Sequence, residues 1–208
     1  MENRLGVFIS GRGSNLQAII EAIAAGRLHA TLAVVVSNIA DAAGLERARA
    51  AGIETLVIAH TDHASRADFD RGLVGALRER RVDLVCLAGF MRLLSPAFIE
   101  AFPNRILNIH PSLLPAFPGL DAQRQAFAHG AKITGATVHL VDAQLDAGPI
   151  VLQGAVPVLE SDTAETLSAR ILEEELRLYP QAIQLILNGG WKVDGRRFVL
   201  PTANSELV

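Results

Sequence analysis

Two polar side chains stand two positions apart in the segment RILNIHPSLLPAFPG, residues 105–119. Asn108 carries an amide that donates or accepts hydrogen bonds, and His110 carries an imidazole that can exchange a proton near neutral pH. The apolar residues around them predict a strand, in which residues i and i+2 point to the same face. We therefore expect both side chains to project into one space, either as part of a catalytic site or as a well-bonded corner.

A third polar group is needed to orient the imidazole or to stabilise its charged form. Asp146, in the loop DAQLDAGP 36 residues beyond His110, is the candidate. The prolines that follow His110 restrict the backbone there and would hold the histidine in place. Taken singly, each residue also has a structural explanation: a strand-end hydrogen bond for Asn108, a buried corner for His110 and a turn for Asp146.

A glycine-rich turn, FISGRGSNLQ, sets Gly11, Gly13, Ser14 and Asn15 between the first predicted strand and the first predicted helix. Such a turn exposes backbone amides and a helix N-terminus to an anion. Leu16 stands where a dinucleotide fingerprint has its third glycine, and the next strand ends in VVVSN without an acidic residue. One phosphate monoester is the better fit, and a tight turn with Ser14 as helix N-cap is the alternative.

The first half of the chain alternates short β-rich runs with helical patterns. Strands are predicted at residues 5–10, 31–37, 55–59, 82–89 and 106–110, and helices at 14–26, 42–52 and 65–81. Continuous Val, Ile and Leu runs separated by helices are typical of parallel strands that are covered on both faces. The predicted fold is therefore α/β, with a doubly wound, mostly parallel sheet and helices on both faces.

The second half changes character. Strands at residues 135–141 and 149–158 flank the Asp146 loop and predict a hairpin or ribbon. A long helix follows from about Thr163, where Asp162 and Glu165 have capping-box spacing, and Pro180 should kink or interrupt it. A short strand and a frayed end are expected after Gly190.

Length and composition predict one domain over residues 1–208 in the cytoplasm. Half of the 208 residues are hydrophobic, and a formal net charge of −3 gives no case for nucleic-acid binding. The lone cysteine, Cys86, lies in an apolar run and is expected to be a buried small hydrophobe. We expect no signal peptide, membrane span or metal site.

Four segments, SGRGSNLQAI, LAGFMRLLSP, NIHPSLLPAFPG and LDAGPIVLQ, together resemble the folate-dependent phosphoribosylglycinamide formyltransferases. The resemblance implies a Rossmann-like formyltransferase fold, with a phosphate-binding half at 1–100 and a catalytic and folate-binding half at 101–208. It implies transfer of the formyl group of 10-formyltetrahydrofolate to the amine of glycinamide ribonucleotide, a step of de novo purine (IMP) biosynthesis. A monomer or homodimer acting on these small molecules is expected.

The resemblance also implies a role for each polar residue. Asn108 would donate a hydrogen bond to the tetrahedral oxyanion that forms when the amine attacks the formyl carbon. His110 would act as a general acid–base or as an imidazolium that faces the oxyanion, and Asp146 would favour its charged form. None of these roles needs a metal.

Binding residues are implied in the same way. The nucleotide phosphate is assigned to the glycine turn and the ribose hydroxyls to a glutamate of the long helix: Gly13, Ser14, Asn15 and Glu175. The folate is assigned to a basic residue, to the MRLL stretch and to the catalytic amide: Arg66, Met91, Arg92, Leu93, Leu94 and Asn108. Without the resemblance, Glu175 in LEEEL would be assigned to a solvated helix face.

Two departures from the family pattern stand out. PGLDAQRQA replaces the common PGLHTHRQA, so Asp121 and Gln123 stand where many members have histidines. LDAGP replaces LDGGP, and Ala147 is expected to be harmless unless its backbone needs positive φ. His139 shares one strand face with Thr137 and is expected to be structural or to act behind the site.

Two alternatives remain open on the sequence. A 10-formyltetrahydrofolate hydrolase would use water as acceptor, but such enzymes usually carry a further N-terminal domain and lack the GSN turn. A nucleotide-binding module without chemistry would explain the glycine turn and leave Asn108, His110 and Asp146 as a coincidence. The segment 142–149 is expected to close over bound folate.

Overall fold

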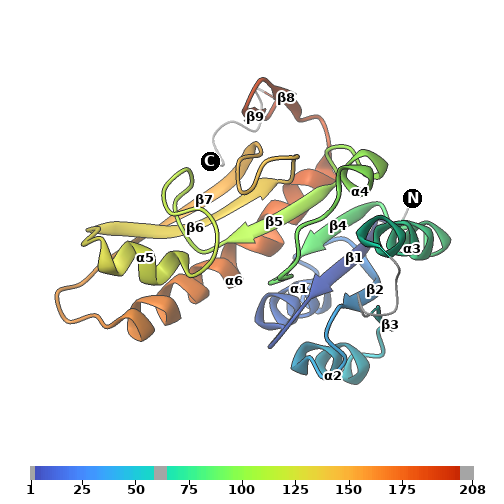
Figure 1. Cartoon of the computed structure of the whole chain (residues 1–208), viewed down its shortest axis with the longest axis horizontal. Coiled ribbons are helices and arrows are strands. Elements are labelled where there is room, and N and C mark those ends of the chain that lie inside the picture. The colour runs from blue at the N-terminus through green and yellow to red at the C-terminus, as the bar shows by residue number, and fades with distance from the viewer. Residues whose placement is uncertain (1–2, 59–64, 202–208) are drawn as a thin grey trace. The chain divides into compact units, whose positions relative to one another are not determined.

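The computed structural model describes residues 3–58 and 65–201, apart from the side chains of residues 66 and 67 (Figure 1). The chain divides into two compact units, Met1–Asn108 and Ile109–Val208. The boundary falls inside strand β5 (Ile106–His110), so Asn108 and His110 belong to one strand.

The first unit is built on parallel strands. β1 (Arg4–Ile9) lies between β2 (Thr31–Ser37) and β4 (Leu84–Leu87); β3 (Thr55–Val57) pairs with β2, and β5 pairs with β4. Its helices are α1 (Ser14–Ala24), α2 (Ala43–Ala50), α3 (Arg66–Glu79) and α4 (Pro96–Ala101). Strand order thus reverses direction between β1 and β4, and ligands of open α/β sheets bind beyond the carboxyl ends of the strands at this point.

The second unit pairs a hairpin with a long helix. β6 (Ile133–Leu140) and β7 (Ile150–Pro157) are antiparallel, and α6 (Ala164–Asn188) packs along both (Figure 1). α5 (Ala122–Ala128) precedes β6, while β8 (Lys192–Asp194) and β9 (Arg197–Val199) form a terminal antiparallel hairpin. The predicted α/β class with a mostly parallel sheet is confirmed, as is the ribbon that carries the Asp146 loop.

Three local expectations are wrong. Pro180 does not interrupt α6, because Tyr179 and Ile183 near it are fully buried and their packing outweighs the lost backbone hydrogen bond. Its capping box uses Thr163 and Thr166 rather than Asp162 and Glu165. α1 begins at Ser14, but its N-cap is Gly13.

Other differences are in element ends and tertiary detail. The strand predicted at 55–59 ends at Val57, and residues 59–64 lie outside the described part of the chain. Cys86 is fully buried, and this burial raises the pKa of its thiol well above the usual range. Within the described ranges, no helix combines the length and apolar character needed to span a membrane.

Two glycines let α1 and α2 approach each other beside the glycine turn. Gly13 has φ of +71°, and a Cβ built on it would lie 2.6 Å from the Cα of Gly44 in the first turn of α2. The amide of Gly44 donates to the carbonyl of Gly11 at 2.9 Å. A Cβ on Gly44 would lie 2.6 Å from Cδ1 of Ile9. Side chains at either glycine would therefore push the turn out of place.

We predict that Gly44→Ala destabilises the protein by about 1–3 kcal/mol, because the added methyl overpacks the contact with Ile9 and Gly13. Urea unfolding followed by circular dichroism measures the change. Gly75→Ala in α3 is the matched control, since a Cβ there meets nothing within 4 Å and should stabilise the helix by about 0.5–1 kcal/mol. Equal stability changes in both variants would contradict the packing argument.

Candidate active site

His110 ends β5 with its ring buried and one ring nitrogen fixed by the following loop. Its Nε2 lies 2.9 Å from the carbonyl oxygen of Phe117, and since a carbonyl only accepts, Nε2 carries a hydrogen. The hydroxyl of Ser112 donates to the carbonyl of Ala116 at 2.6 Å and lies 3.2 Å from that of Phe117. The proline-rich segment therefore folds back onto the imidazole and sets its orientation.

Asp146 meets the other ring nitrogen. Its Oδ2 lies 3.5 Å from Nδ1 of His110 and accepts a 2.8 Å hydrogen bond from the amide of Gly119. The Asp146 side chain is 9% exposed and the His110 side chain 6%, so this carboxylate and ring meet in a dry environment. Asp146 has φ of +50°, a left-handed conformation that Asp tolerates better than most residues. The structure thus brings His110 and Asp146 together.

A second imidazole, His139 on β6, lies on the other oxygen of the same carboxylate. Its Nε2 is 3.7 Å from Oδ1 of Asp146, and its Nδ1 is 2.9 Å from the carbonyl oxygen of Leu140, to which it must donate. Burial lowers the pKa of His139, and the Leu140 carbonyl and the Asp146 carboxylate oppose that shift only in part. The sequence placed this histidine behind the site, and the structure places it against Asp146.

Thr137, two residues before His139 on β6, forms hydrogen bonds with the segment that follows His110. Thr137 is fully buried, donates to the carbonyl of Ser112 at 2.6 Å and accepts from the amide of Leu114 at 3.0 Å. His139 and Thr137 share a strand face, so this face of β6 contacts the loop that follows His110. The alternation of side chains along β6 was the signal in the sequence that could have placed His139 on the face that meets Asp146.

Asn108 lies on β5 two residues before His110 and is half-buried. It is paired in register with Leu87 of β4. Because side chains alternate along a strand, the amide is on the same face of β5 as the imidazole. The strand predicted from the sequence at 106–110 is the strand observed, so this part of the geometry follows directly from it.

The glycine turn presents a helix start suited to an anion. Gly13 caps α1 in the left-handed conformation, and no described side chain forms a cap hydrogen bond there. The first turn of α1, SNLQ, contains no acidic residue, so its amides and the helix dipole favour negative charge. Ser14 is half-buried and Asn15 is buried.

The MRLL stretch follows β4 at the topological switch point of the first unit. Met91 and Leu93 are 66% and 61% exposed, so both apolar side chains are accessible to a ligand. The guanidinium of Arg92 lies over the ring of Phe69, 4.8 Å from its centroid. Arg66 is the first residue of α3, but its side chain lies outside the described part.

Glu175 differs from its acidic neighbours on α6. It is 8% exposed, whereas Glu173 is exposed and Glu174 is half-buried. The solvated face that the LEEEL pattern suggests is therefore wrong for Glu175. A carboxylate buried on the packed side of a helix is costly without a function or a partner.

Comparison with known proteins identifies the family of this chain. Residues 3–183 match the formyl transferase family. The chain belongs to this family. It is 47% identical over 190 residues to the phosphoribosylglycinamide formyltransferase of Escherichia coli, covering 91% of this chain and 87% of that protein. The family expected from the four motifs is confirmed.

Two further relatives frame the match. A crystal structure of glycinamide ribonucleotide transformylase 1 from Symbiobacterium toebii is 56% identical, with a TM-score of 0.94 over 96% of this chain and 95% of that chain. The trifunctional purine biosynthetic protein adenosine-3 of Drosophila melanogaster is 48% identical over 188 residues, 89% of this chain. The chain spans only 14% of the length of that trifunctional relative.

The departures from the common formyltransferase motifs all lie in the second unit. The left-handed conformation falls on Asp146 and not on Ala147, so the condition under which the alanine would be strained does not arise. Gly148 does need to be glycine, since a Cβ there would lie 1.8 Å from the carbonyl oxygen of Leu140. Asp121 is the exposed N-cap of α5 with φ of +54°, and Gln123 is half-buried.

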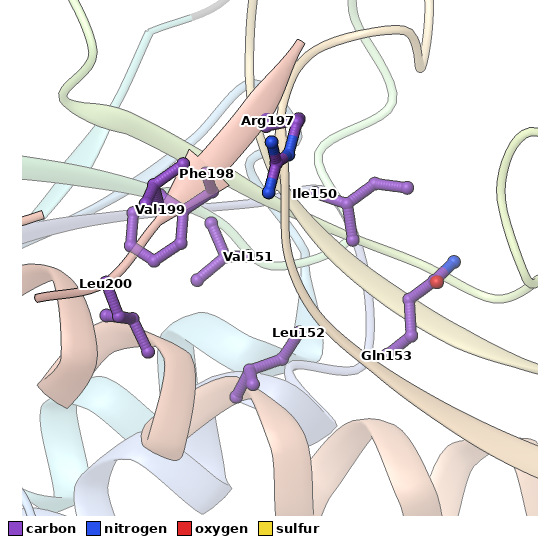
Figure 2. Close-up of a pocket in the computed structure, with 8 residues that line it drawn as sticks. All are labelled: Ile150, Val151, Leu152, Gln153, Arg197, Phe198, Val199 and Leu200. Carbon is purple, nitrogen blue, oxygen red and sulfur yellow. The ribbon is translucent and has the colours of Figure 1, made fainter. Parts of the chain in front are cut away.

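A cavity of about 390 Å³ lies in the second unit, between β7 and the terminal hairpin. β7 and β9 pair only at Ile150 and Arg197, and the cavity lies where they diverge (Figure 2). Its lining is Ile150, Val151, Leu152, Gln153, Arg197, Phe198, Val199 and Leu200. None of these is a residue that the formyltransferase motifs assign to the site.

We predict that stability falls as the pH drops below about 6.5, because the unfolded chain binds a proton at His139 more readily than the folded protein does. His139→Asn removes the titration while keeping a donor near the Nδ1 position. Urea unfolding at pH 7.5 and 5.5 should show a smaller stability loss in this variant than in the parent. An unchanged loss would mean that His139 does not titrate between the two states.

Proposed function

We propose that this chain is a phosphoribosylglycinamide formyltransferase. It transfers the formyl group of 10-formyltetrahydrofolate to the amine of N1-(5-phospho-D-ribosyl)glycinamide and releases tetrahydrofolate, in de novo purine (IMP) biosynthesis. The observation that carries the proposal is the buried contact of 3.5 Å between Nδ1 of His110 and Oδ2 of Asp146, beside Asn108 on β5. The names of the relatives in Escherichia coli and Symbiobacterium toebii support the choice of substrate.

The proposed chemistry uses these side chains in sequence. The glycinamide nitrogen attacks the formyl carbon, a C–N bond forms, and the carbonyl oxygen becomes an oxyanion that the Asn108 amide stabilises by donating a hydrogen bond. The bond from the formyl carbon to the folate nitrogen then breaks as the carbonyl re-forms. One proton leaves the attacking nitrogen, and one is delivered to the departing folate nitrogen.

His110 moves these protons in the proposal. Its Nε2 hydrogen is committed to the carbonyl of Phe117 at 2.9 Å, whereas the 3.5 Å contact of Nδ1 with Asp146 is beyond ordinary hydrogen-bond length. Nδ1 is therefore the nitrogen that can change partner when substrate arrives. The Asp146 carboxylate stabilises the imidazolium that forms during transfer.

The binding roles complete the proposal. The glycine turn at Gly13, Ser14 and Asn15 takes the phosphate, which agrees with its uncapped helix start. Glu175 accepts from the ribose hydroxyls. The folate is held by Arg66, Asn108 and residues 91–94. The reaction takes place in the cytoplasm on two small-molecule substrates, by a monomer or homodimer, without nucleic acid, membrane or metal.

The test is the spectrophotometric release of folate product from a 10-formyl folate, with and without glycinamide ribonucleotide. We predict release that depends on the nucleotide. Release without it would favour the hydrolase, and no release at all would favour a nucleotide-binding module.

We predict that Asn108→Ala lowers kcat by about 10²–10³, because one oxyanion donor is lost. His110→Ala should abolish turnover and leave nucleotide affinity intact, measured by calorimetry. His29→Ala is the matched control, since this histidine is exposed in the first unit. Full activity of both site variants would refute the assigned roles.

A further inference from the structure

The segment from Met91 to Ser95 is held at each end by a side chain that accepts a hydrogen bond from its backbone. At the first end, the hydroxyl oxygen of Ser10 accepts from the amide of Met91 at 2.9 Å. The single hydroxyl hydrogen of Ser10 is donated to Oδ1 of Asn38 at 2.6 Å. A hydroxyl whose hydrogen is committed in this way can only accept from Met91, so its orientation is fixed.

Ser10 also joins two loops of the first unit. Its own amide donates to the carbonyl of Gly89 at 3.1 Å, next to the bond from Met91. Ser10 directly precedes the glycine turn, and residues 89–91 follow β4. One residue therefore connects the loop after β1 to the loop after β4, across the topological switch point of the sheet.

At the other end of the segment, a buried carboxyl group accepts the hydrogen bond from the backbone. Oδ2 of Asp70 in α3 accepts from the amide of Ser95 at 2.7 Å, and Asp70 is only 2% exposed. Ser95 is the N-cap of α4, and its own hydroxyl accepts from Phe98. The residue before Asp70, Phe69, carries the Arg92 guanidinium on its ring. Consecutive residues of α3 thus bind both Arg92 and Ser95.

Packing alone gives the segment little support. Met91 and Leu93 are mostly exposed, so their burial contributes little to fixing the backbone between the two ends. A buried carboxyl group is costly unless it forms hydrogen bonds, and Asp70 accepts one from the backbone at the end of this segment. The two end contacts, together with the contact of Arg92 on Phe69, therefore order the backbone of residues 91–94.

We propose that Ser10 and Asp70 are positioning residues that hold residues 91–94 in the conformation that binds the formyl-folate. The proposal rests on the function proposed above, in which this segment contacts the folate. Neither side chain needs to touch the substrate. Loss of either one loosens the segment and weakens the binding of the folate while the chemistry of bound substrate is retained.

The experiment compares Ser10→Ala and Asp70→Ala with the conservative Ser10→Thr and Asp70→Asn, which keep an acceptor oxygen. Steady-state kinetics should show KM for the formyl-folate raised about tenfold or more in the alanine variants, since a hydrogen bond to each backbone amide is lost. KM for the nucleotide and kcat at saturating folate should stay within about twofold. The conservative variants should recover most of the loss.

The matched controls lose comparable bonds elsewhere. Asp162 accepts from the amide of Leu159 at 2.8 Å with its side chain 4% exposed, and Ser168 donates to the carbonyl of Ala164 at 2.7 Å. Asp162→Ala and Ser168→Ala should change stability without changing KM for the folate. If they raise it as much as the test variants do, or if both substrates are affected equally, the positioning role is refuted.

Amide hydrogen exchange without substrate separates this proposal from the proposed function. The amide hydrogens of Met91 and Ser95 should exchange faster in the alanine variants than in the parent. If Asp70→Ala folds too poorly for kinetics, exchange can still be measured in Ser10→Ala and Asp70→Asn. Unchanged exchange refutes the anchoring. If the parent is inactive and exchange is nevertheless faster in the variants, the proposed function and the folate-binding role of residues 91–94 are refuted. The result would still show that Ser10 and Asp70 hold the backbone of this segment.

Discussion

The buried carboxylate of Asp146 organises the second unit around it. Its two oxygens face two imidazoles and one backbone amide, from His110, His139 and Gly119. A carboxylate with so little exposure is costly unless it accepts a hydrogen bond, and the Gly119 amide in the segment after His110 supplies one, which ties the β6–β7 loop to that segment. The left-handed backbone of Asp146 and the glycine requirement at Gly148 follow from that convergence.

Backbone carbonyls determine which nitrogen of each imidazole carries the hydrogen. Phe117 takes the hydrogen on Nε2 of His110, and Leu140 takes the hydrogen on Nδ1 of His139. Each ring therefore turns its other nitrogen toward Asp146. In the first unit, Gly13 and Gly44 lie close together beside the start of α1, where no described side chain forms a cap hydrogen bond.

The sequence was sufficient wherever local pattern decides structure. β5 was predicted at its observed bounds, and alternation along it places Asn108 and His110 on one face. His110 and Asp146 are 36 residues apart, separated by α5 and β6, so their meeting depends on tertiary packing that no local preference specifies. Pro180 shows the converse, because tertiary burial of α6 overrides a strong local tendency to break the helix.

Glu175 is an acidic residue on the buried, apolar face of α6. Ile171 and Leu178 lie one turn before and after it on α6, and all three are buried. Helical spacing alone therefore separates Glu175 from Glu173, although LEEEL looks like a uniform acidic run. Replacing it by leucine would continue the stripe and remove the desolvation penalty of a buried carboxylate, so packing does not explain why this position is charged.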